Sequence, residues 1–191
     1  MLKYLAFVAA VFLQPVAGYA QDRGIKFDQI QPGTQFHYVS FKGRPKHVDV
    51  YTGKSKGFHI IKSYFLRAGR LQDAPFWVMY YNEAGLMVRR DKMAFKQRHE
   101  YKPFDCEQSG SRTCSHRKTV TYWDNSRRGS QSLKNFEIRQ TGRSRVIIRN
   151  AKGNRLKERI KLNDLNIVIE RRRSPSDISD GYKLGKTLVP R

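Results

Sequence analysis

The sequence lacks several features that would assign it to a familiar functional class. Its 191 residues contain two cysteines, and acidic residues are scarce: 16 Asp and Glu stand against 38 Lys and Arg, for a formal net charge of +22. No stretch shows a dependable helical period, and no apolar run reaches the roughly 20 residues that a membrane-spanning helix needs. The HExxH and P-loop motifs are missing as well, and the one GxSxG match, at residues 53–57, falls in the expected turn TGKSKG between two strands, not in a turn from a strand to a helix. These absences disfavour a helical fold, a transmembrane helix and the common hydrolases.

The N-terminus has the pattern of a secretory signal. Lys3 precedes an apolar run from Leu5 to Leu13, and small residues dominate the stretch Ala17 to Ala20. We expect residues 1–20 to be a signal peptide that is cleaved before Gln21. The sequence therefore predicts a periplasmic or secreted protein.

Both cysteines lie in one short stretch. Cys106 and Cys114 are separated by seven residues that include Ser-Gly-Ser, and export would expose them to an oxidising compartment. We predict a disulfide that closes a hairpin loop and contributes roughly 2 to 3 kcal/mol. A CxxC redox motif is absent, and His116 alone does not complete a zinc site. No metal or other cofactor is expected.

Short apolar runs alternate with turn sequences about every ten residues, which is typical of an all-β protein. We expect an antiparallel meander of about ten strands in one domain, as a curved sheet or an up-and-down barrel. Its parts are a lead-in segment at 21–33, the β-meander domain at 34–173 and a C-terminal tail at 174–191. The expected strands are 34–41, 47–51, 58–66, 76–81, 86–90, 93–100, 114–123, 130–139, 143–149, 155–162 and 165–170.

Three turns near the C-terminus predict a register. A QTG loop would pair Phe136 with Val146, a three- or five-residue loop at NAKGN would keep the same parity, and a two-residue Asn163-Asp164 turn would pair Leu162 with Leu165. All three turns place branched aliphatic residues on one inward face. The outward face would then carry seven cations: Arg143, Arg145, Arg149, Arg155, Lys157, Arg159 and Lys161.

Such a row of cations predicts attachment to a polyanion. Candidate partners outside the cytoplasm are lipopolysaccharide, anionic lipid, acidic polysaccharide and nucleic acid, the last without sequence specificity because no aromatic residues separate these cations. The same face also suits a surface that only keeps a sheet edge from aggregating. A second hypothesis is a carrier of an acylated or other apolar ligand, because the aromatic stretch PFWVMYYN suits a curved sheet with an apolar concavity.

A third hypothesis, a metal-dependent hydrolase, depends on histidines. His47, Asp49 and Tyr51 alternate along one strand and share a face, and an even-parity KGRP hairpin would bring His37 to it. Two imidazoles and a carboxylate suit a metal or a general base. A histidine on a strand is more often structural, so we expect a binding protein without catalytic residues.

The stretch Phe104-Asp105-Cys106 with Cys114, together with the PGTQFHY sequence at residues 32–38, resembles small exported bacterial β-rich proteins of uncharacterised function. In that group a short loop between two cysteines joins two β-rich halves. The resemblance implies a similar fold and brings no activity with it.

Overall fold

The computed structural model describes residues 24–101, 113–151, 154–174 and 181–190. The predicted signal peptide, Cys106 and the side chain of Cys114 lie outside the described residues, so the disulfide stays a prediction. The elements are η1 (Phe27–Gln29), β1 (Gln35–Val39), β2 (Pro45–Ser55), β3 (Phe58–Tyr64), β4 (Leu66–Arg67), β5 (Arg70–Leu71), β6 (Trp77–Tyr81), β7 (Met87–Lys92), η2 (Met93–Phe95), β8 (Gln97–Tyr101), β9 (Thr113–Tyr122), β10 (Ser130–Thr141), β11 (Ser144–Ala151), β12 (Asn154–Leu162), β13 (Val168–Ser174) and β14 (Tyr182–Leu188).

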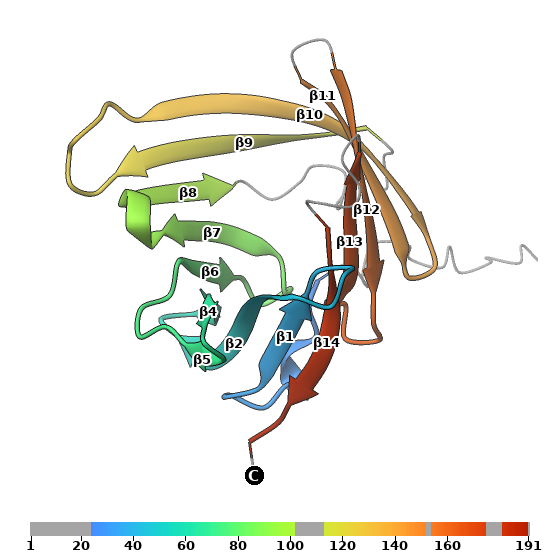
Figure 1. The fold of residues 1–191 in the computed structure, drawn as a ribbon. Coiled ribbons are helices and arrows are strands. Elements are labelled where there is room, and N and C mark those ends of the chain that lie inside the picture. The colour runs from blue at the N-terminus through green and yellow to red at the C-terminus, as the bar shows by residue number, and fades with distance from the viewer. Residues whose placement is uncertain (1–23, 102–112, 152–153, 175–180, 191) are drawn as a thin grey trace, which may run out of the picture.

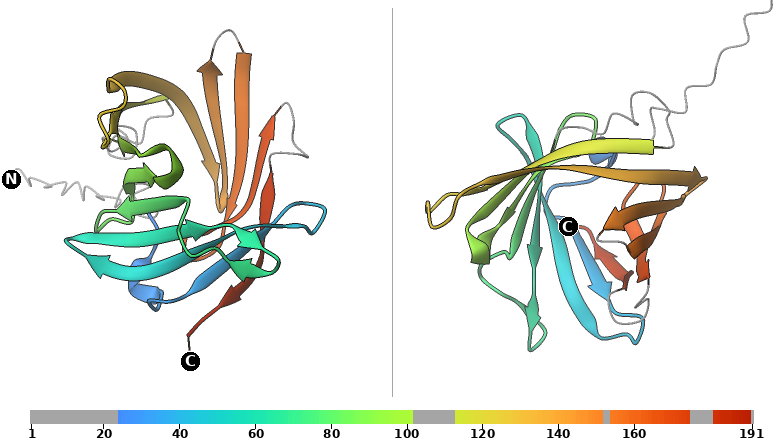
Figure 2. Two further views of the ribbon diagram at one scale, coloured as in Figure 1. Left: turned by 60° about the vertical axis from the view of Figure 1, so that its left-hand side comes forward. Right: turned by 90° about the horizontal axis from the view of Figure 1, so that it is seen from above.

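The predicted all-β antiparallel meander is confirmed, with twelve strands in one sheet and a separate β4–β5 hairpin. Strands that are consecutive in this sheet pair with each other, and β14 pairs with β1, so the order of pairings closes on itself. The β13–β14 seam is narrow, with two residue pairs. Figures 1 and 2 show β1 beside β14 at the lower end, below the long β9 and β10 strands.

No helical segment in the described part of the chain has the length and apolarity to cross a membrane. The described helical turns are the two three-residue 3-10 turns, η1 and η2.

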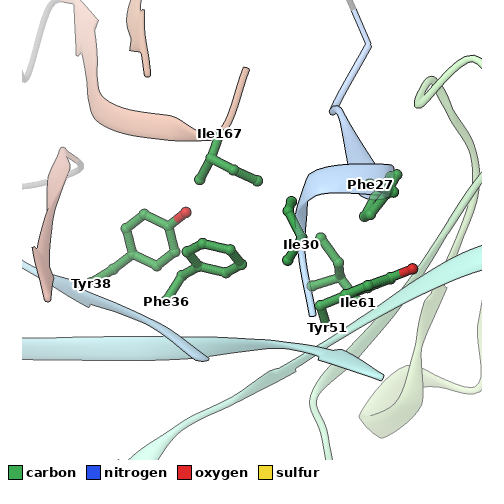
Figure 3. Packing of buried hydrophobic residues seen from close by; sticks show 7 residues of the cluster. All are labelled: Phe27, Ile30, Phe36, Tyr38, Tyr51, Ile61 and Ile167. Atoms are coloured by element: carbon green, nitrogen blue, oxygen red, sulfur yellow. The ribbon is translucent and has the colours of Figure 1, made fainter. Parts of the chain in front are cut away.

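The segments predicted as a lead-in and a tail are both integral to the fold. Residues 24–34 cross the sheet interior, where Phe27 and Ile30 join a core with Phe36, Tyr38, Tyr51, Ile61 and Ile167 (Figure 3). The backbone of Ile25 bonds to Gly85, where any side chain would collide with Ile25. The supposed tail contains β14, which supplies β1 with a hydrogen-bonded neighbour.

The predicted C-terminal registers are wrong, because the turns have other lengths. Thr141 pairs with Ser144 across a two-residue turn in which Gly142 adopts a positive φ of 55°, so Phe136 pairs with Arg149 rather than Val146, and Ile138 pairs with Ile147 rather than Ser144. Two residues also separate the Ala151–Asn154 pair. Each change shifts the parity by one and exchanges the two faces of the strand.

The third turn is longer than predicted. Leu162 pairs with Val168, not Leu165, and the five residues between them are held by the Asn163 side chain. Its Oδ1 accepts hydrogen bonds from the backbone N–H groups of Leu165 and Ile167, at 3.0 and 2.9 Å. An asparagine that bonds to the backbone after it stabilises such a loop and competes with a tight hairpin.

Candidate functional site

The seven predicted cations do not share one face. Arg145 pairs with Ile160, so it lies on the opposite side of the sheet from Lys157, Arg159 and Lys161. The backbone of Arg149 pairs with Leu156, which by alternation assigns it to the Arg145 side, although its side chain is outside the described residues. Arg143 is a turn residue, and its guanidinium contacts the Asp164 carboxylate in an exposed ion pair. By alternation Arg155 belongs to the Lys157 face, although its side chain is outside the described residues.

A basic face does exist, but on β12, β13 and β14 instead of β11 and β12. Arg159 lies directly opposite Arg172, and Lys161 opposite Glu170, which in turn pairs with Lys183. Lys186 continues the same side of β14 and pairs with His37 of β1. We call this set the outer basic face: Lys157, Arg159, Lys161, Arg172, Lys183 and Lys186, all exposed.

One acid lies within the outer basic face. Glu170 accepts a hydrogen bond from Arg172 Nε at 2.7 Å and lies 3.4 Å from Lys161 Nζ. Its burial favours the neutral acid, yet Arg172 and Lys161 keep the pKa of Glu170 below its usual value. Among the described residues, no ion pair reaches Lys157, Arg159, Lys183 or Lys186. The face therefore keeps a large excess of positive charge.

On the other side of the same strands the charged side chains are paired and largely buried. On β12 and β13, Glu158 and Arg171 form an ion pair on the inward side, with side chains 9% and 25% exposed. Arg171 also donates to the Tyr182 hydroxyl at 3.4 Å. Burial alone would lower the pKa of Arg171, but Tyr182 and Glu158 beside it raise that pKa above its ordinary value. The guanidinium thus remains charged inside the fold.

The inward side also collects the residues on which a hydrolase was predicted. His47 and Asp49 do face the same way, with His47 Nε2 3.8 Å from Asp49 Oδ1. His37 does not join them, because Tyr38 lies opposite His47 and His37 pairs with Val48. A bulge after Tyr38 changes the register that the KGRP turn suggested. The His37 prediction is therefore wrong.

The resulting cluster is poorly arranged for nucleophilic catalysis. Ser63 donates a hydrogen bond of 2.5 Å to Asp49 Oδ1, the same oxygen that His47 approaches. A catalytic serine needs the imidazole itself as its base, with the carboxylate on the far side of the ring. Ser63 is also only 1% exposed, so no substrate reaches its hydroxyl. These three residues are best explained as a buried structural network.

Burial sets the charge of this network. It raises the pKa of Asp49 to about 7, against the opposing hydrogen bond from Ser63. It lowers the pKa of His47 to about 4, with Arg171 and Lys46 adding to the effect. His47 is therefore neutral at pH 7, and Asp49 is protonated in about half of the molecules. In the described part of the chain no group of three His, Cys, Asp or Glu residues is placed to hold a metal ion.

Sequence reasoning missed Arg172, Lys183 and Lys186. Alternation within the run Glu170 to Arg173 would have placed Arg171 and Arg172 on opposite faces. The two lysines could be assigned to this face only from the pairing of β14, because their segment was predicted to be a tail.

No protein-family model, curated protein or solved structure matches the chain. The function must therefore be inferred from the chemistry of these residues, and the resemblance to small exported proteins stays a prediction.

Proposed function

We propose that this chain is an exported binding protein that attaches to a polyanion through the outer basic face. The observation that carries the proposal is the direct juxtaposition of Arg159 and Arg172 across β12 and β13, with no acid between them. Like charges at such positions destabilise a sheet, and a bound polyanion would remove that repulsion.

The chemistry of the face favours repeated phosphate or sulfate groups. Arginine presents several donors in a plane that suits an oxyanion, and lysine adds point charges along the strand. Lipid A phosphates and sulfated or acidic polysaccharides offer such groups. Nucleic acid would bind by its backbone alone, because Phe41, the aromatic ring near this face, is covered by the Arg172 guanidinium at 4.3 Å.

The test compares charge-matched variants in a salt series. The triple variant Lys157→Gln, Arg159→Gln, Arg172→Gln is titrated with heparin and with lipopolysaccharide, beside wild type and a control triple of exposed cations elsewhere, Lys54→Gln, Lys56→Gln, Arg117→Gln. Each lost contact should lower the slope of log affinity against log salt by about 0.7 to 0.9, as for nucleic-acid phosphates. We expect a loss of about two units in the first triple and a much smaller loss in the control.

Equal slopes for the two triple variants would overturn the site, since affinity would then follow net charge alone. An oligonucleotide arm in the same series would show whether the preferred polyanion is nucleic acid.

Carriage of an apolar ligand is the weaker candidate. The interior near the described core is filled by the chain itself: the Phe27 ring packs against His59, Tyr51 and Tyr81 with centroid distances of 4.5, 4.9 and 5.2 Å. We therefore favour a surface function.

A further inference from the structure

Three loops at one edge of the sheet expose large apolar side chains. The loop between β3 and β6 exposes Phe65, the η2 turn between β7 and β8 exposes Met93 and Phe95, and the loop after β9 exposes Trp123. Their exposures are 48%, 41%, 68% and 43%, respectively. We call these four residues the apolar rim. Figure 1 shows the η2 turn and the β9–β10 loop at the same left-hand edge, far from β12 and β13.

Backbone hydrogen bonds join the three loops into one surface. The Met93 N–H donates to the carbonyl of Phe76, and the Trp123 N–H donates to the carbonyl of Lys96, both at 3.1 Å. The Phe65 ring stacks on Phe76 with a centroid distance of 3.9 Å. The three loops that carry the apolar rim are thus neighbours along the edge.

Each of the three loops also carries two cations. Lys92 and Lys96 flank Met93 and Phe95, and Lys92 Nζ lies 5.9 Å from the centre of the Phe95 ring. Lys96 pairs with Asp124 at 3.5 Å. The full set is Arg67, Arg70, Lys92, Lys96, Arg127 and Arg128, and the acids in the same loops are Asp73 and Asp124. The edge therefore has an excess of four positive charges.

This combination fits the surface of an anionic bilayer. Apolar tips enter the boundary between headgroups and acyl chains, while nearby Lys and Arg side chains attract the anionic headgroups. Tryptophan suits that boundary because its ring is apolar and its N–H is polar. Single-stranded nucleic acid needs free aromatic faces, but Phe76 covers one face of Phe65, and Met93 has no ring.

We propose that the apolar rim attaches the protein peripherally to a membrane rich in anionic phospholipid, with Met93, Phe95 and Trp123 inserted at the headgroup level. This surface is separate from the outer basic face and does not depend on polyanion binding there.

The test measures cosedimentation with vesicles of phosphatidylcholine containing 30% phosphatidylglycerol. Every described strand and the core segment lie after residue 23, so the chain from Gln21 onward is used, without the apolar run that could itself bind lipid. The double variant Phe95→Ser, Trp123→Ser should bind at least tenfold more weakly than wild type. The control Leu188→Ser, Val189→Ser removes two other exposed apolar side chains, 43% and 59% exposed, and should bind like wild type.

A second readout places the rim directly. Trp123 and Trp77 are the two tryptophans of the chain. Lipids brominated near the headgroup should quench wild-type fluorescence much more strongly than that of a Trp123→Phe variant, because Trp123 is 43% exposed whereas Trp77 is half-buried between Arg90 and Phe76.

The two proposals fail separately. If the rim is correct, its double variant keeps wild-type heparin affinity, and the outer-face triple variant keeps vesicle binding. Vesicle binding that survives loss of Phe95 and Trp123, or that disappears only in the outer-face triple, would overturn the rim. Trp123 quenching by an oligonucleotide but not by vesicles would also overturn it and assign the surface to nucleic acid.

Discussion

Both faces of the β12–β13 pair carry charged side chains, but on one face the charges are buried and paired, and on the other they are exposed and mostly of one sign. Inside, Arg171 is matched with Glu158 and the Tyr182 hydroxyl. Outside, Arg159 faces Arg172 in water, and Glu170 is the acid that lies among six cations. Burying an unpaired charge costs several kcal/mol, whereas an exposed one costs little. A charge that is buried on the inner side therefore needs its partner, whereas the excess charge on the outer side stays in water at little cost.

The largest effect should come from breaking the inner pair. Glu158→Gln leaves the Arg171 guanidinium largely buried beside a neutral amide, and we expect a loss of about 3 kcal/mol. Urea unfolding at pH 7 measures this loss through the denaturation midpoint.

The matched control replaces both partners. In the double variant Glu158→Leu, Arg171→Met no buried charge is left unpaired, because Arg173, the other cation near Glu158 at 4.0 Å, is half exposed. Stability should therefore return to within about 1 kcal/mol of wild type. A Glu158→Gln protein as stable as wild type would show that solvent reaches Arg171 freely, and the contrast between the two faces would disappear.

The strands could be predicted from the sequence, but their faces could not. Residues of one kind recur at every second position, as in Phe36 and Tyr38 and in the HVDVY run, which indicates a strand directly, and Gly-containing turns mark the strand ends. The face, however, depends on whether a turn has two or three residues. Gly142 and Arg143 form a two-residue turn, and that single change moved Arg145 away from the predicted site.

Long-range pairing explains the remaining errors. The β14 segment contains Gly185 and several lysines, so its own pattern is a weak strand pattern. It forms a strand because it pairs with β1, which lies more than a hundred residues earlier in the sequence. The Glu158–Arg171 pair was equally hidden, because a sequence run of charges gives no indication of which members are buried.

An intermediate effect is expected from pH, and its main contributions come from the buried groups with the largest pKa shifts. The pKa of His47 and of His99 is lowered to about 4, in both cases mainly by burial. Between pH 4 and 6.5 the unfolded chain therefore binds more protons at these residues, and stability rises with pH. Asp49 acts in the opposite sense: its pKa of about 7 makes stability fall as the pH rises from about 4 to 7.

Below about pH 6.5 the two histidines outweigh the single carboxyl, so stability rises with pH. Between about pH 6.5 and 8 the unfolded histidines and the folded Asp49 carboxyl lose their protons together, and their opposite effects nearly cancel, so the stability of the wild type should be flat there. Asn is nearly isosteric with Asp and still accepts the Ser63 hydrogen bond. The Asp49→Asn variant lacks the opposing carboxyl, so its stability should keep rising between about pH 6.5 and 8, where that of the wild type is flat, as measured by urea midpoints. Parallel pH profiles for the two proteins would show that Asp49 is ionised normally.

The smallest change in stability should come from substitutions on the outer face, and whether the protein gains or loses stability is what tests the proposal. Removing one of two directly opposed guanidinium groups relieves repulsion, so Arg159→Gln should be stabilised by up to about 0.5 kcal/mol at low salt. Screening at 0.5 M salt should reduce this gain toward zero. Lys161→Gln removes the same charge but also a contact with Glu170, and it should gain nothing. If Arg159→Gln were instead less stable at low salt, Arg159 would have an acidic partner. The outer face would then be neutralised like the inner one, and its positive charge would no longer be held at a cost that a polyanion relieves.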